Sequence, residues 1–236
     1  RKIASIKAFF SYLEYEELLL ENPFSKIRVK FQEPSLLPRT ITTQNIQKLF
    51  ETLYRLSVET TTVYQLWIVI RDIAVLELLL STGLRVSELC SLSFSDIDSE
   101  QGFVRIYGKG SKERILQITN LSVIEALTNY RCLWGNQPET AGFFFCNRLG
   151  HRLSEQSVRL MIKRYAQLAN IAESITPHMF RHTFATLLLE EDVDIRYIQR
   201  ILGHSSIMTT QIYTHVTNCR QRDILTTKNP RNKIYI

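Results

Sequence analysis

A helix start with a cationic face lies in the stretch Thr176-Pro177-His178-Met179-Phe180-Arg181-His182-Thr183. Threonine is a good helix cap, and the proline that follows it is favoured at the first helical position. His178 and Arg181 are three residues apart, so both project from one face near the positive end of the predicted helix. An arginine guanidinium stays charged at any working pH and offers a planar fork of donors. The stretch therefore predicts a helix that presents a phosphate-binding surface.

Two polar motifs follow it, Leu202-Gly203-His204-Ser205 and Gln211-Ile212-Tyr213-Thr214-His215. The glycine of the first motif is expected to close a short helix, which would place His204 as a further donor to a phosphate. Tyr213 could attack the bound phosphate. A phenol has a pKa of about 10, so at neutral pH this attack needs a base that removes the phenol proton, and His178 is the candidate. Taken alone, Tyr213 is by default a half-buried core tyrosine with a hydrogen-bonded hydroxyl. His182 and His215 are expected to be structural or peripheral.

An arginine also follows a glycine turn far upstream, in Thr82-Gly83-Leu84-Arg85-Val86-Ser87-Glu88-Leu89. The apolar segment from about 62 to 81 predicts a buried helix that Gly83 ends. Arg85 and Arg181 would then each hold one non-bridging oxygen of a phosphodiester. Glu88 either orients Arg85 through a charged hydrogen bond or lies on the surface at a helix start.

Residues 103–118 alternate in polarity and contain a Gly-Lys-Gly-Ser-Lys turn, which predicts a β-hairpin with a basic tip. The turn lacks the spacing of a nucleotide-binding loop. If the bound phosphate belongs to a DNA strand, the leaving group is a deoxyribose hydroxyl. This group leaves poorly as a bare alkoxide, so a general acid is needed, and Lys109 at the tip would supply it. Lys112 and Arg114 are expected either to be solvated or to touch DNA backbone phosphates.

The rest of the chain is predicted to be helical almost throughout. Residues 3–20 have helical spacing, and Pro23 to Arg39 has the composition of a linker, which places a boundary near residue 35. A helix capped by Ser154 carries two further cations on its polar side, Arg159 and Lys163, as candidate DNA contacts.

Composition limits the function classes. The 236 residues carry a net charge of +6, and the pI is about 9.2, which favours a polyanionic partner. Four widely spaced cysteines indicate neither a zinc site nor a disulfide framework, and a reducing cytoplasm fits them best. Charged residues interrupt the longest apolar run, so no ordinary membrane span is predicted. The first residues already have a helical pattern, so an N-terminal portion is expected to be missing.

The ordered set Arg85, Lys109, His178, Arg181, His204 and Tyr213 resembles the tyrosine recombinase, or phage integrase, family. The sequence around these residues is similar to that of the Xer-type subgroup. The resemblance covers about residues 36–220. The resemblance implies a mainly α catalytic domain with a small antiparallel β-sheet over 36–217, preceded by a core-binding domain. Residues 1–22 would be the last helix of that domain, residues 23–35 the linker, and residues 218–236 a C-terminal tail.

The resemblance also implies the roles of the six residues. Arg85 and Arg181 hold the scissile phosphate, Lys109 protonates the 5′ hydroxyl, and His178 assists proton transfer. His204 stabilises the transition state, and Tyr213 forms a 3′-phosphotyrosyl link that a second hydroxyl can reverse. Neither a metal nor a cofactor is implied.

The implied partner is double-stranded DNA with specific recombination sites. Four identical protomers would act on two sites through a Holliday junction, and the tail would dock on a neighbouring protomer. A bacterial or archaeal cytoplasm, with nucleoid association, is expected. Integration by a mobile element and resolution of chromosome or plasmid dimers stay open, as do accessory proteins. A type IB topoisomerase and an idle architectural DNA-binding protein are the alternatives.

Overall fold

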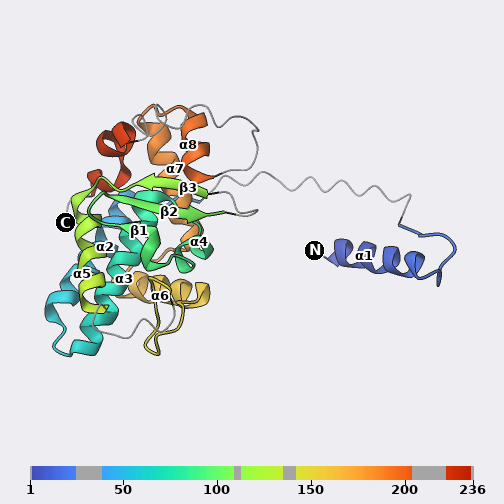
Figure 1. Ribbon diagram of the computed structural model, residues 1–236, viewed down its shortest axis with the longest axis horizontal. Coiled ribbons are helices and arrows are strands. Elements are labelled where there is room, and N and C mark those ends of the chain that lie inside the picture. The colour runs from blue at the N-terminus through green and yellow to red at the C-terminus, as the bar shows by residue number, and fades with distance from the viewer. Residues whose placement is uncertain (1, 25–38, 109–112, 135–141, 204–221, 235–236) are drawn as a thin grey trace. The chain divides into compact units, whose positions relative to one another are not determined.

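The computed structural model describes residues 2–24, 39–108, 113–134, 142–203 and 222–234 (Figure 1). The chain divides into two units, residues 1–37 and 38–236. In the first unit, helix α1 (Lys2–Tyr15) ends before residue 20, where the spacing of apolar residues places its end. The reason is local, because Glu17 adopts the left-handed conformation with φ of 58° and turns the chain.

Helix α3 (Val63–Thr82) is the central element of the second unit, and most of its residues from Val69 onward are buried. Helices α2 (Thr43–Glu59) and α5 (Leu121–Trp134) pack against it and run beside it in Figure 1. It ends at Gly83, as its sequence predicts, with φ of 62°. A Cβ on this glycine would lie 2.7 Å from the Phe184 ring, so only glycine lets the helix end approach that ring.

Three antiparallel strands form one sheet in the order β1-β2-β3. The expected hairpin is present as β2 (Phe103–Tyr107) and β3 (Glu113–Gln117), and β1 (Ile97–Asp98) adds an edge strand that the sequence pattern does not predict. Val104 pairs with Leu116, and Ile106 pairs with Arg114. The apolar members of these pairs are buried, so this face of the sheet closes the core.

The remaining helices complete the second unit. They are α4 (Val86–Cys90), α6 (Glu155–Leu168), α7 (Pro177–Glu190) and α8 (Ile195–Leu202). Ser154 caps α6 through its hydroxyl, and Pro177 is the first residue of α7, as expected. Gly203 ends α8 with φ of 66°. The fold is therefore mainly α with a small antiparallel sheet, which confirms the predicted class.

The described part of the tail packs on its own unit. Residues 222–228 are helical, and a 3-10 turn η2 (Pro230–Lys233) contacts α3 and α7. Arg231 is buried and donates to both carboxylate oxygens of Glu77, at 2.6 and 2.8 Å. The Asn229 amide donates to the Ser81 carbonyl at 3.1 Å. Buried polar contacts thus join this segment to the central helix.

Among the described helices, none has the length and apolar character that crossing a membrane requires.

Candidate active site

Arg181 lies at the meeting point of two helix ends. Its residue surface is 7% exposed, and its Nη1 donates to the Gly83 carbonyl at 2.8 Å. Its Nη2 donates to the Leu202 carbonyl at 2.6 Å. Carbonyl groups at a helix C-terminus have no partner within the helix and carry partial negative charge. A cation from α7 therefore ties the ends of α3 and α8 together and has its guanidinium fixed by them.

Arg85 occupies the cap position of α4, two residues after the glycine that ends α3. Its Nη1 donates to Glu88 Oε1 at 2.9 Å, and its backbone N–H donates to Glu88 Oε2 at 2.9 Å. The Arg85 side chain keeps 38% of its surface exposed. Since Glu88 is buried, it is the orienting carboxylate and not a surface residue, which decides between the two interpretations that the sequence allows.

Arg114 reaches the same carboxylate from β3. Its Nη1 and Nη2 donate to the two oxygens of Glu88 at 3.0 and 2.8 Å, and its Nε donates to the Ile201 carbonyl at 3.2 Å. Only 15% of the side chain is exposed. The structure therefore commits one N–H on each nitrogen of Arg114 to the protein, where the sequence leads us to expect solvent or DNA phosphates.

The three guanidinium groups and the Glu88 carboxylate, which we call the arginine cluster, have an excess of positive charge. Burial of Glu88 alone would raise its pKa, but hydrogen bonds from Arg114 and from the Arg85 backbone outweigh burial and lower it. Burial, then the positive charge of Arg85, lowers the pKa of Arg181 to about 10, so Arg181 stays charged at neutral pH. A cluster of this kind can stabilise an anion.

His178 and His182 lie one turn apart on α7, and both are exposed. Burial, followed by the positive charges of His178 and Arg181, lowers the pKa of His182. His178 is the second residue of the helix, near its positive end. The two residues of the predicted phosphate-binding face therefore differ in depth, with His178 at the surface and Arg181 beneath it.

Four of the predicted residues lie outside the described part of the chain: Lys109, Lys112, His204 and Tyr213. The structure does describe the residues that directly precede Lys109 and His204. Strand β2 ends two residues before Lys109, and Gly203, directly before His204, lies against Arg114 of the arginine cluster. Arg159 and Lys163 are exposed on α6, as expected, and Arg159 pairs with Glu155 one turn away at 2.9 Å.

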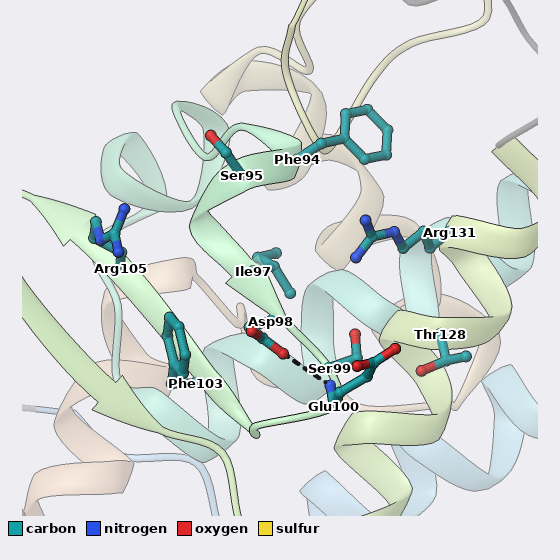
Figure 2. Close-up of a pocket in the computed structure, with 10 residues that line it drawn as sticks. All are labelled: Phe94, Ser95, Ile97, Asp98, Ser99, Glu100, Phe103, Arg105, Thr128 and Arg131. Atoms are coloured by element: carbon teal, nitrogen blue, oxygen red, sulfur yellow. Dashed lines mark hydrogen bonds between the residues drawn. The ribbon is translucent and has the colours of Figure 1, made fainter.

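Two cavities of the described structure lie away from the arginine cluster. One of about 640 Å³ is bounded by β1, β2 and α5, and Figure 2 shows Arg105 and Arg131 on opposite sides of it. Another, of about 760 Å³, is lined by Tyr54, Arg231 and Ile234, among other residues. No described member of the predicted catalytic set lines either cavity. Within the described residues, no group of three or more His, Cys, Asp or Glu side chains is arranged to hold a metal ion.

The sequence pattern does indicate that Arg114 occupies an inward-facing position. Leu116 and Ile118, two and four residues further along, are buried, so strand alternation places residue 114 on the same inward side. A cation at such a position needs a buried acidic partner. The identity of that partner is a tertiary fact, because Glu88 lies 26 residues earlier in the chain.

Known proteins are similar in sequence to nearly all of this chain. The model of the phage integrase family matches residues 39–220. A tyrosine recombinase of Agathobacter rectalis is 54% identical over 235 residues, which cover the whole chain and 77% of that protein. XerD of Listeria innocua is 38% identical over 98% of the chain and 75% of its own length.

Solved structures show the same fold. The crystal structure of XerA recombinase aligns with a TM-score of 0.63 at 29% identity, over 99% of this chain and 75% of that one. XerH in its post-cleavage complex with a palindromic difH substrate aligns with a TM-score of 0.71 at 24% identity, over 96% and 65% of the two chains.

Proposed function

Because the chain belongs to the phage integrase family, and is therefore a site-specific DNA recombinase that cleaves and rejoins strands, we propose that Arg85 and Arg181 hold the scissile phosphate for attack by Tyr213. One observation carries this assignment: Arg181 is fixed between two helix ends while Arg85, held by Glu88, remains partly exposed. Preorganised donors of this kind lower the barrier of phosphoryl transfer, because charge gathers on the equatorial oxygens.

The proposed reaction has a complete balance of bonds and protons. The Tyr213 hydroxyl attacks phosphorus and gives its proton to His178 while the bond from phosphorus to the 5′ oxygen breaks. Lys109 donates a proton to that oxygen, and His204 contributes a donor to the transition state. The product is a 3′-phosphotyrosyl link that retains the energy of the broken bond. Attack by a second 5′ hydroxyl reverses the step and reseals a strand without a nucleotide cofactor.

We further propose that four protomers act on two specific DNA sites and exchange strands pairwise through a Holliday junction. DNA complexes among the solved structures of similar fold, such as XerH with difH, support duplex DNA as the partner. Lys112, Arg159 and Lys163 would contact its backbone. The bacterial sources of the relatives support action at the bacterial nucleoid.

The tail is proposed to contribute to contacts between protomers. Its described part is packed on its own catalytic unit through Arg231 and Asn229. Docking of these two side chains on a neighbour would require their buried contacts to break.

Covalent capture tests the proposed function. Purified protein is incubated with a nicked suicide duplex that carries the recombination site of its own host, and the products are resolved on a denaturing gel. We expect an adduct of protein with the 3′ phosphate, which peptide mass spectrometry locates at Tyr213. If the wild-type protein forms no adduct on such a duplex, the proposed mechanism is wrong.

Replacing Lys109 with alanine should slow cleavage of ordinary DNA and leave a 5′-bridging phosphorothioate substrate little affected. The sulfur leaving group needs no proton, so it removes the need for a general acid. Single-turnover rates on the matched pair of substrates measure this rescue. Equal defects on both substrates would argue against Lys109 as the acid.

A further inference from the structure

Arg114 joins three parts of the chain that carry proposed catalytic groups. It stands on β3, the second strand of the hairpin, and Lys109 lies between the two strands in the sequence. Its terminal nitrogens form a two-pronged contact with Glu88 at 2.8 and 3.0 Å, and its Nε donates to the Ile201 carbonyl at 3.2 Å. A planar fork can satisfy a carboxylate and a carbonyl at once, which a lysine ammonium cannot do in this geometry.

The carboxylate that Arg114 holds is the one that orients Arg85. Glu88 accepts the Arg85 side chain at 2.9 Å through Oε1, and the Arg85 backbone N–H at 2.9 Å through Oε2. Each oxygen of Glu88 thus takes one bond from each arginine. Because both oxygens are shared, the position of Glu88, and with it the direction of Arg85, depends on Arg114.

The same guanidinium supports the segment that leads to His204. A Cβ built on Gly203 would lie 2.8 Å from Arg114 Nη1 and 3.0 Å from its Cζ, so the arginine rests directly against the glycine backbone. Arg181 donates to the carbonyl of Leu202, the residue directly before Gly203. Two arginines therefore bind two successive carbonyls at the end of α8, Arg114 that of Ile201 and Arg181 that of Leu202.

We propose that Arg114 is a positioning residue for cleavage, which aligns Arg85 through Glu88 and aligns the end of α8, directly before His204, through Ile201 and Gly203. The inference rests on the proposed function of Arg85 and His204. It gives Arg114 no contact with DNA, and its described contacts lead to the groups that hold the phosphate. Loss of Arg114 should therefore disturb the binding of the transition state and not the protonation of the leaving group.

Arg114→Lys tests this assignment. We expect the variant to keep its melting temperature within a few degrees and to bind the duplex with wild-type affinity and salt dependence. Its single-turnover cleavage rate at saturating protein should fall by between about 10-fold and 100-fold, as small misplacements of catalytic groups do. The bridging phosphorothioate should not restore this rate, in contrast to Lys109→Ala.

Arg105→Lys is the matched control. Arg105 lies on the same hairpin and pairs with Glu113 at 2.8 Å, outside the arginine cluster. This variant should cleave both substrates at the wild-type rate. Arg114→Gln, which keeps an amide donor for Glu88 but removes the charge, is measured against the same control, and it also serves if Arg114→Lys does not fold.

The outcomes separate the possible roles. A salt slope reduced by about one unit in Arg114→Gln, which removes the charge, would show a lost phosphate contact and overturn the inference. Rescue by the bridging sulfur would also overturn it, because Arg114 would then act through the leaving-group acid. A wild-type rate in the variant would leave Arg114 with no part in cleavage. The proposed function fails separately, when the wild-type protein itself forms no adduct.

Discussion

Tyr213→Phe is expected to abolish covalent attachment to DNA and to leave DNA binding almost unchanged. Phenylalanine lacks the oxygen that would bond to phosphorus, and loss of a nucleophile typically slows an enzyme by at least about a thousand-fold. Affinity for duplex DNA comes mainly from contacts of cations with phosphates, which this substitution leaves in place. The adduct is measured on the nicked suicide duplex, and the dissociation constant by fluorescence anisotropy on the intact duplex.

Tyr107→Phe is the control for this result. Tyr107 is an exposed tyrosine at the end of β2, with 56% of its surface accessible. It has no part in the proposed reaction, so its variant should form the adduct at the wild-type rate. An adduct in the Tyr213 variant, or its loss in the Tyr107 variant, would assign the nucleophile elsewhere.

Arg231→Met should be the most destabilising single change in the described tail. Glu77 is fully buried, and the substitution leaves its carboxylate with the Tyr54 hydroxyl, at 2.7 Å, and without its cation. Breaking a buried ion pair by removal of one partner costs about 3–5 kcal/mol. Urea denaturation followed by circular dichroism measures this loss, which corresponds to a fall in melting temperature of about 10 °C.

Two further variants give this prediction its controls. Arg231→Met combined with Glu77→Leu removes both charges, so the double variant should be more stable than Arg231→Met alone. Lys233→Met removes an ion pair between Lys233 and Glu191 at the surface of the same tail, and it should change stability little. Equal losses from Lys233→Met and Arg231→Met would show that the buried pair does not anchor the tail.

Local pattern predicted most of the helices, because caps, glycine ends and apolar spacing act within a few residues. Ser154, Pro177 and Gly203 lie at the helix ends where their chemistry places them. The pattern failed in two kinds of place. Strand β1 is only two residues long, too short for alternation to mark it, and α1 ends at a left-handed turn with no glycine.

By itself the sequence determined the class of fold, the basic character of the protein and the residue types for phosphoryl transfer, because capping, periodicity and spacing are local properties. Only the tertiary structure decided what these residues contact. Glu88 is a buried partner of two arginines, and Arg114 faces the protein because a strand distant in sequence lies beside α4. Arg231 joins the tail to the central helix through an ion pair with Glu77, 154 residues earlier. A charged group withdrawn from water needs a partner, and folding alone determines which one lies within reach.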